Sequence, residues 1–437
     1  MPAMGAYSSG MDTSSIKRYW LAAGLGSLWA AFILIAQFGG AFDGLEEPLL
    51  DWRQSLPSLR PDQDSQNQLA LIAIDYIPAD RPWPWPRLDY VILLRSLLPY
   101  APKSVVFETL LHDRDTRYSA FDSTFGGLVN RLDHLVFAAA ALMPDSKTPP
   151  PGNLTVVPTR GSLGNMPRFG SALWPLETFA SSASVGISNL MPETNGQVRR
   201  LPLLFLYQNR VIPSLTLQAV AHNLNADWKK SEAILGDAIF LRGENGQLLR
   251  TIPIDEQGRL RLRFRPGAST FWTASFGNVP LYDQQRERGE TPELNLAELR
   301  GRQVWVGRTD RKDLPSIGQT LPHLSPIELQ MLGTCNILNS DFIRRPPAWS
   351  LVTAFLLFSG MSAAFYLRYG WIAGAVFGGI ITWVWWEASF TLFRAANLDL
   401  PIISFTLLTF GLAAAAYAAQ EWELKPDDGD QLSLQLK

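Results

Sequence analysis

Four long apolar stretches, placed unequally along the chain, are the feature that most constrains its fold. One lies near the start, at residues 19–42, and three follow one another near the end, at residues 347–367, 371–393 and 401–420. Each approaches or exceeds the roughly 20 apolar residues that cross a hydrocarbon core as a helix. The sequence therefore predicts four transmembrane α-helices, one N-terminal and three C-terminal.

The segment between the first two stretches, residues 43–346, has the composition of an ordinary soluble domain and is long enough to bury a core without disulfides. The whole chain carries 38 basic and 40 acidic residues, so its charge does not indicate a nucleic-acid partner. Cys335 is the only cysteine. Its apolar surroundings favour a buried helical residue over a redox sensor or a lipid attachment point.

Charges beside the apolar stretches predict the orientation of the chain in the membrane. Lys17 and Arg18 precede the first stretch and acidic residues follow it, which places residues 1–18 in the cytoplasm and residues 43–346 outside. An arginine pair before the second stretch opposes this orientation, but long domains translocate largely regardless of charge. Four spans then return residues 421–437 to the cytoplasm. We expect a multi-pass protein of the bacterial cytoplasmic membrane, with its domain facing the periplasm or the cell exterior.

The first stretch favours an uncleaved membrane anchor over a cleaved signal peptide. It is longer than an ordinary signal core, and the segment AQFGGAFDG lacks a convincing small-x-small cleavage site.

Strands and helices alternate in the first part of the predicted domain. Short apolar runs predict strands at residues 68–75, 103–111 and 134–142, and helical spacing predicts helices at residues 88–98 and 118–132 between them. This alternation predicts parallel pairing with right-handed crossovers. The expected fold class is α/β, a mixed but largely parallel sheet with flanking helices, in addition to the four transmembrane helices.

Later segments extend this prediction. Residues 184–190 and 299–310 are predicted to be buried strands, and residues 326–338 a helix before the membrane. A turn at Gln208–Asn209 is followed by a helix from about Ser214, and several strands of antiparallel character come after it. The Pro-, Thr- and Gly-rich residues 148–166 are predicted to be a loop.

The order of several short motifs resembles the CHASE2 extracellular sensory domain, over roughly residues 40–420. These motifs are LIAID, WPWPR, VVFE, HLVFAAA, SVGISNL, NGQVRRLPLLF, VIPSLTLQAV and RGRQVWVGRTDRKDLPSIGQTLP. The layout of one span, a domain and three further spans is also that of the family. Two departures are Glu108, where the family more often has aspartate, and SPIELQMLGTCNIL, where a glycine-containing helix start is expected.

The resemblance implies a sensor whose output module follows the last span, a nucleotide cyclase or a kinase. The tail EWELKPDDGDQLSLQLK is too short to fold into such a module. We therefore expect neither cyclase nor kinase activity, and a separate cytoplasmic or membrane effector as partner.

Three carboxylates are predicted to converge at one edge of the sheet, because Asp75, Glu108 and Asp310 each follow a predicted strand. They would form a pocket for a small ligand or a divalent cation, or else cap helices and pair with arginines. In WPWPR, tryptophans covering the sheet edge are favoured over tryptophans stacking on a ligand. The candidate ligand-binding residues are Asp75, Arg81, Arg87, Glu108, Asn189 and Asp310.

No sequence motif predicts catalysis, a cofactor or a bound metal. The four histidines do not stand in a metal-ligand spacing, and no phosphate-binding or nucleophile motif is present. Glu387 is an acidic residue within a predicted span, where we favour an interfacial carboxylate over a buried functional one. Gly374, Gly378 and Gly379 on the same helix indicate close helix packing or a homodimer.

The favoured interpretation is a membrane-anchored sensory protein. Its extracytoplasmic domain would respond to a small ligand or a protein and shift the packing of the transmembrane helices. The competing interpretation is a membrane-anchored enzyme or transport accessory that uses the acidic sheet edge and Glu387. A receptor with a purely structural role is a third possibility.

Overall fold

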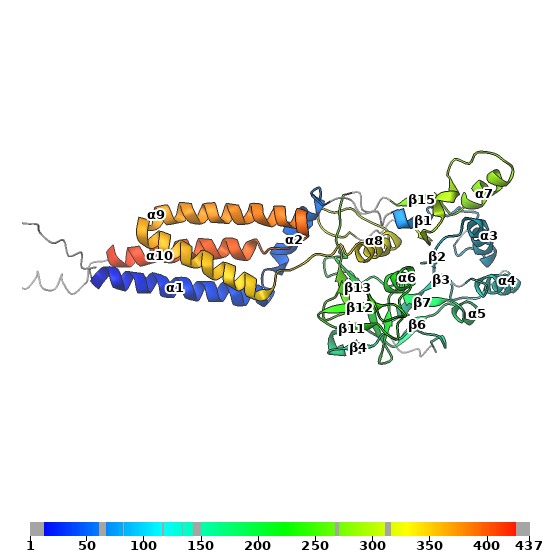
Figure 1. The fold of residues 1–437 in the computed structure, drawn as a ribbon, viewed down its shortest axis with the longest axis horizontal. Helices are drawn as coiled ribbons and strands as arrows, with labels where there is room; N and C mark the ends of the chain where they lie inside the picture. Colours follow the sequence, from blue (N-terminus) through cyan, green and yellow to red (C-terminus); the bar gives the residue numbers. More distant parts are fainter. Residues whose placement is uncertain are drawn as a thin grey trace, which may run out of the picture. The chain divides into compact units, whose positions relative to one another are not determined.

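Five apolar runs predicted as strands, together with two strands that were not predicted, β6 (Ser171–Leu173) and β15 (Trp272–Ser275), form one seven-stranded sheet in the computed structural model of the protein (Figure 1). The five predicted strands are β1 (Leu69–Ile74), β2 (Ser104–Phe107), β3 (Leu135–Leu142), β7 (Ser184–Ile187) and β16 (Gln303–Arg308). They follow the order β15-β1-β16-β2-β3, with β6 and β7 both paired to β3. Only the pairing of β3 with β6 is antiparallel, so the prediction of a largely parallel sheet is confirmed.

The chain divides into two compact units, which are described separately. The α/β unit is Gln54–Ile343, and the helical unit joins Met1–Arg53 to Arg344–Lys437. The expected domain, residues 43–346, is slightly longer than the α/β unit. Parts of the expected cytoplasmic ends lie outside the described residues. The structure describes residues 13–60, 67–81, 83–115, 118–132, 134–142, 150–266, 271–310 and 316–424.

The strand β16 lies between β1 and β2, so the first two predicted strands do not pair with each other. Trp305 of β16 is matched with Leu71 of β1 on one side and with Val106 of β2 on the other. Neighbouring strands in sequence are usual partners, which is why the sequence favoured a direct pairing. The carboxyl ends of β1, β16 and β2 therefore lie side by side.

Helices cover both faces of the sheet. They are α3 (Arg87–Leu97), α4 (Ser119–Val129), α5 (Glu177–Ala180), α6 (Leu215–Leu224), α7 (Val279–Glu287) and α8 (Pro326–Leu338). Alternate residues of β1 enter different clusters: Leu71 packs with residues of α6 and α8, and Ile72 packs with residues of α3, α4 and α7. A fully buried Leu or Ile contributes about 1.5–3 kcal/mol, so both faces hold the sheet in place.

Three smaller sheets complete the α/β unit, with the strand orders β10-β9-β5, β13-β12-β11-β4 and β14-β8. The tight turn at Gln208–Asn209 is confirmed, with positive φ at both residues, and Ser214 caps the following helix α6. Their strands are β4 (Thr159–Arg160), β5 (Arg168–Phe169), β8 (Arg200–Pro202), β9 (Leu204–Tyr207), β10 (Arg210–Pro213), β11 (Glu232–Ile234), β12 (Ala238–Arg242), β13 (Leu248–Pro253) and β14 (Arg259–Arg261).

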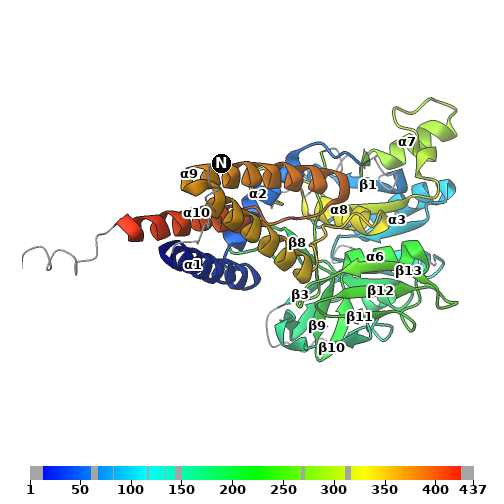
Figure 2. The same ribbon diagram turned by 60° about the vertical axis from the view of Figure 1, so that its left-hand side comes forward.

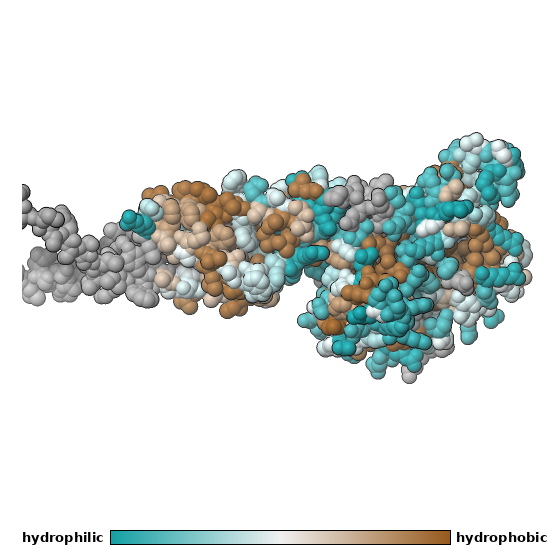
Figure 3. Space-filling model, in the orientation of Figure 1, coloured by the Kyte–Doolittle hydropathy of each residue, from teal (hydrophilic) through white to brown (hydrophobic). Residues whose placement is uncertain are grey.

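The helical unit contains α1 (Thr13–Phe38), α2 (Asp43–Ser55), α9 (Ala348–Ala396) and α10 (Ile403–Leu424). The long helix α9 is interrupted at Gly370, whose φ of 82° is non-helical. Figures 1 and 2 show α1, α9 and α10 side by side. Figure 3 shows a predominantly apolar outer surface on this unit. Its exposed apolar side chains include Ile35 and Leu357.

Two helices in the described residues are long and apolar enough to cross a membrane, Ala348–Tyr366 and Arg368–Ala396. This corrects the expectation of four. The first apolar stretch is bent by 70° between Ala23–Phe38 and Asp43–Ser55, and counts as a third span only if that pair is taken together. The described apolar part of the last stretch, Ile403–Ala418, is shorter than a typical span.

Close helix packing accounts for one glycine of the predicted small-residue stripe. A Cβ on Gly374 would lie 1.9 Å from the ring of Tyr366, so this glycine admits the tyrosine between the two parts of α9. A Cβ on Gly379 would meet no atom within 4 Å. Gly411 of α10 has the same role at the contact with α1, because a Cβ there would clash with the ring of Trp29.

Gly186 of β7 offers a test of the packing between the sheet and α6. A Cβ there would lie 2.6 Å from Leu215 Cα and 2.7 Å from Leu215 N, which are backbone atoms. We expect Gly186→Ala to lower the free energy of unfolding by about 1–3 kcal/mol. Gly127→Ala is the control, because its Cβ meets open space on the exposed side of α4 and should stabilise by about 0.5–1 kcal/mol. Equal melting temperatures of the two purified full-length variants would contradict this packing.

Candidate functional site

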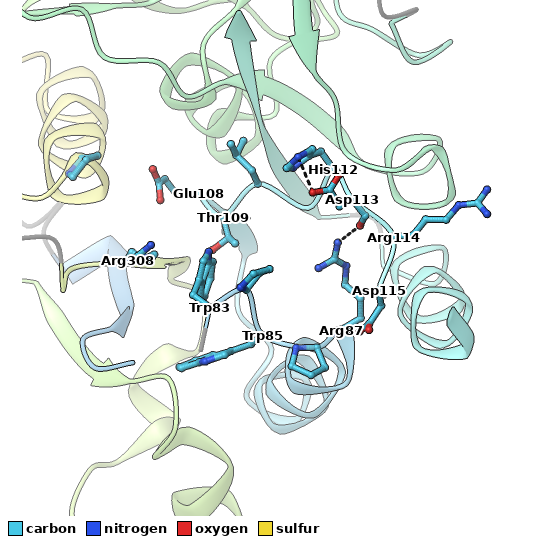
Figure 4. A pocket seen from close by; sticks show the side chains of 14 residues that line it. Trp83, Trp85, Arg87, Glu108, Thr109, His112, Asp113, Arg114, Asp115 and Arg308 are labelled. Carbon is cyan, nitrogen blue, oxygen red and sulfur yellow. Dashed lines mark hydrogen bonds and ion pairs between the residues drawn. The ribbon is translucent and has the colours of Figure 1, made fainter. Parts of the chain in front are cut away.

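A pocket of about 510 Å³ opens at the carboxyl ends of β2 and β16 (Figure 4). Ligands of parallel sheets bind at this edge of the strands. Four separate segments of the chain contribute to its wall, so the pocket exists only in the folded unit. The lining residues are Trp83, Pro84, Trp85, Pro86, Arg87, Glu108, Thr109, Leu110, His112, Asp113, Arg114, Asp115, Arg308 and Pro326.

The proline-rich segment before α3 presents one tryptophan to the pocket and buries another. Trp85 is 7% exposed, packs on Phe276 at 5.2 Å between ring centroids, and donates from Nε1 to the Arg81 carbonyl oxygen at 3.1 Å. Trp83 is half-buried. Trp85 therefore covers the sheet edge, as the favoured interpretation held, whereas Trp83 is available to a ligand.

Arg87 is a buried anchor for the loop on the far side of the pocket. Its guanidinium donates to the Asp113 carbonyl oxygen and lies 3.4 Å from the carboxylate of Asp122. Its backbone N–H, at the start of α3, donates to Asp115 Oδ2 at 2.8 Å. Asp115 in turn donates from its backbone to Asp122 Oδ2 at 2.8 Å. These bonds fix residues 113–115 against α3 and α4.

Glu108 and Thr109 follow β2 and line the pocket floor. Glu108 lies over Gly307 of β16: a Cβ on that glycine would be 2.9 Å from Glu108 Oε2 and 2.7 Å from Ile327 Cδ1. The glycine therefore makes room for the carboxylate. Thr109 is 5% exposed, and its side chain interacts with Tyr90, whose pKa is raised by burial.

Arg308 ends β16 and stands beside Trp83. Its guanidinium donates from Nε and Nη2 to both carboxylate oxygens of Asp310, at 2.8 and 3.0 Å. The hydrogen bonds with Asp310 raise the pKa of Arg308. The guanidinium carbon lies 5.3 Å from the centroid of the Trp83 ring, within cation–π range. A planar cation and a planar aromatic ring are thus held together at one wall.

His112 borders this pocket and a second pocket of about 360 Å³ that includes Trp174. Its Nε2 lies 3.0 Å from Asp113 Oδ2, and its buried Nδ1 has no hydrogen-bond partner among the described residues. Figure 4 shows Glu108, Trp83 and Arg308 on one side of the main pocket and His112 and Arg87 on the other.

Arginines and carboxylates alternate around the pocket, and Arg87 and Arg308 are already paired with protein acceptors. Among the described residues, the pocket therefore offers no large unpaired charge that could neutralise a strongly charged ligand. The wall suits a small polar molecule with a planar part for Trp83.

Two of the six candidate residues, Arg87 and Glu108, line the pocket. Asp75 is exposed and accepts a hydrogen bond from Ser275 Oγ at 2.8 Å. Asp310 acts through Arg308, as described above. Arg81 is bound to Asp89 on the surface. The predicted convergence is therefore partial.

Asn189 serves the sheet rather than the pocket. Its side-chain amide accepts from the Ala141 N–H at 2.7 Å and donates to the Ala141 carbonyl oxygen at 3.0 Å, which completes the pairing of β3. Glu387 lies on the surface of α9 in the helical unit.

The divalent-cation interpretation of the three carboxylates is not supported. Throughout the described part of the chain, no three His, Cys, Asp or Glu side chains are grouped so that they could hold a metal ion.

Sequence reasoning missed His112 and Arg308 as pocket residues. Arg308 had a usable signal, because it ends a strand whose preceding residues are all buried, at the same edge as Glu108. His112 had none, since a single histidine after a strand carries no spacing pattern.

A family model described as the CHASE2 domain matches residues 27–367 of the chain. No match was found among curated proteins. None was found among solved structures.

Arg87 and Arg81 form a matched pair for testing the pocket wall. Removal of the buried Arg87 guanidinium leaves the Asp122 carboxylate without its cation, so Arg87→Met should lower the free energy of unfolding by about 3 kcal/mol or more. Arg81→Met removes a surface ion pair and should cost at most about 1 kcal/mol. Urea unfolding of both full-length proteins measures the difference, and equal losses would show that Arg87 does not anchor the loop.

Proposed function

The chain belongs to the CHASE2 domain family, a family of extracellular sensory domains, and we propose on this basis that it is a membrane-anchored sensor. Its α/β unit would bind a small polar ligand in the pocket beside β2, β16 and α3. The bound state would then pass through transmembrane helices to an effector on the cytoplasmic side. CHASE2 is a sensory rather than a catalytic domain, which agrees with a protein that is not an enzyme.

The pocket at the carboxyl ends of the parallel strands is the observation that carries this proposal. It joins Trp83, Glu108 and Arg308 from three distant segments, and hydrogen bonds hold Arg87 and Arg308 in place before any ligand arrives. Preorganised side chains lower the ordering cost of binding. A partly exposed tryptophan beside a paired arginine supplies a stacking surface with hydrogen-bonding groups at its margin.

The helical unit supports a membrane anchor, and we propose that the chain crosses a bacterial cytoplasmic membrane. The proposed spans include Ala348–Tyr366 and Arg368–Ala396, with residues 43–346 outside the cytoplasm. Two helices that meet the length and composition of a span support this arrangement, together with the apolar outer surface of the helical unit.

Binding must favour one arrangement of the helices for a signal to pass. A ligand shifts a two-state equilibrium only by its difference in affinity for the two states. The α/β unit is joined to the helical unit at both of its ends, through Gln54 and Ile343. A change inside the unit therefore has two covalent routes into the helices. Whether two copies of the chain associate stays a prediction.

A chimera with an adenylate cyclase catalytic domain after Leu424 tests the sensory role. If the pocket controls the helices, Trp83→Ala and Glu108→Gln should each change cyclase output at least threefold from that of the unaltered chimera. Leu281→Ala, on the exposed side of α7, is the control and should leave the output unchanged. Identical output from all four proteins, at equal amounts in the membrane, would refute the proposal.

Protease added to intact spheroplasts tests the orientation. We expect cleavage within residues 54–343, while an N-terminal tag stays protected until the membrane is permeabilised. Protection of the α/β unit in intact spheroplasts would place that unit in the cytoplasm and exclude an extracellular sensor.

A further inference from the structure

Arg53, near the end of α2, is a completely buried cation in the helical unit. Its Nη1 donates to Ser389 Oγ at 2.8 Å and to the Leu400 carbonyl oxygen at 3.2 Å, and its Nη2 donates to Asp399 Oδ1 at 2.8 Å. The guanidinium carbon lies 5.4 Å from the centroid of the Phe393 ring. These acceptors belong to the end of α9 and to the α9–α10 loop, residues 397–402.

A second bond ties α2 to the start of α10. Glu46 Oε1 accepts a hydrogen bond from the backbone N–H of Ile403 at 2.7 Å. Trp52 packs edge-to-face on Phe390 of α9, at 4.7 Å between centroids. The helix α2 is thus attached to α9, to the α9–α10 loop and to α10.

The other connection to the α/β unit reaches the same loop. Arg344 donates from its backbone to the Asn397 carbonyl oxygen at 2.9 Å and accepts from the Asp399 N–H at 2.8 Å. Arg345 Nε lies 3.9 Å from Asp399 Oδ2. The loop is therefore held by the segment through which the chain leaves the α/β unit, as well as by α2.

Arg53 and Arg344 stand at the two points where the chain enters and leaves the α/β unit. Arg53 is the last residue of the helical unit before Gln54, and Arg344 is the first one after Ile343. Both covalent routes out of the α/β unit are consequently bonded to one short loop, which leads directly into α10. A displacement of either route therefore acts on that loop, and through the loop on α10.

A planar guanidinium suits this place better than an ammonium group. Arginine offers five donors in a fixed fork, and here it reaches a hydroxyl, a carbonyl and a carboxylate at once. Lysine keeps the charge but has a single nitrogen, so it cannot satisfy acceptors spread over that fork. An apolar side chain leaves the Asp399 carboxylate with only the more distant and exposed Arg345.

We propose that Arg53 is a positioning residue that fastens the α9–α10 loop to α2, so that the two move as one body. The fastened loop is the point at which both connections from the α/β unit act on α10. This coupling role rests on the proposed sensory function, whereas the fastening itself does not.

Hydrogen exchange of the full-length protein in phosphatidylcholine–phosphatidylglycerol nanodiscs tests the fastening. The Asp399 and Ile403 amides are the reporters, because they bond to Arg344 and Glu46. We expect Arg53→Met to raise exchange at both amides at least tenfold. Arg53→Lys should give a smaller increase. Exchange at Val306 in the sheet should not change, which separates local release from general destabilisation.

Arg345→Met is the matched control, because it removes the exposed arginine from the same carboxylate and should change exchange less than twofold. Ser389→Ala removes one of the three acceptors and serves if Arg53→Met does not fold. Unchanged exchange at Asp399 and Ile403 in Arg53→Met, or in Ser389→Ala where only that variant folds, would overturn the proposal. Equal increases in the Arg345 and Arg53 variants would also overturn it.

The cyclase chimera distinguishes failure of the fastening from failure of the sensory function. With both correct, Arg53→Met should abolish the difference in output between Trp83→Ala and the unaltered pocket. A retained difference would refute the coupling role of Arg53. Absence of that difference when Arg53 is intact would refute the sensory function, and the exchange result would still decide the fastening.

Discussion

The pairing of β16 with both β1 and β2 is the interaction on which the rest of the α/β unit depends. Residues 303–308 come long after the other two strands in the chain, yet they form parallel ladders with both of them. This insertion places Arg308 next to the end of β2, and it places Gly307 beside both Glu108 and Ile327 of α8. Without the insertion of β16, the residues that follow β2 and Arg308 at the end of β16 would not lie at the same edge of the sheet, and the pocket would not form.

The pocket shows how a chain with little net charge can build a polar site. Its charged groups are held by one another: Arg87 by the loop at residues 113–115, and Arg308 by Asp310. Burial of Arg87 costs free energy that its partners offset, and hydrogen bonds hold both arginines in place before a ligand binds. Of the two tryptophans in the wall, Trp85 is buried and Trp83 is only half-buried, so the ring of Trp83 is the one that can stack on a ligand.

The sequence predicted those parts of the fold that depend on neighbouring residues. Apolar runs and helical spacing correctly located β1, β2, β3, β7 and β16, and also α3, α6 and α8. The order of the strands could not be predicted, because it depends on which edges meet after the chain has folded. β15 was missed for a related reason, since its four residues, WTAS, carry little apolar pattern. The same limit applies to the site. The rule that ligands bind at the carboxyl ends of parallel strands correctly identified Glu108 as a pocket residue. The rule did not predict that the Asn189 side chain would bond to the backbone of β3 instead.

Hydropathy identified the apolar stretches but not the role of the polar residues between them. Arg53 lies in a segment that resembles the start of a soluble domain, and nothing local indicates that Asp399 will meet it. Apolar helix faces tolerate small shifts against one another, because dispersion contacts are individually weak. A buried guanidinium does not, since a shift of its acceptors leaves a charge without hydrogen bonds. The position of α2 on α9 and α10 therefore depends on a few polar atoms as well as on the packing of Trp52 against Phe390, and these polar atoms lie where the chain passes into and out of the α/β unit.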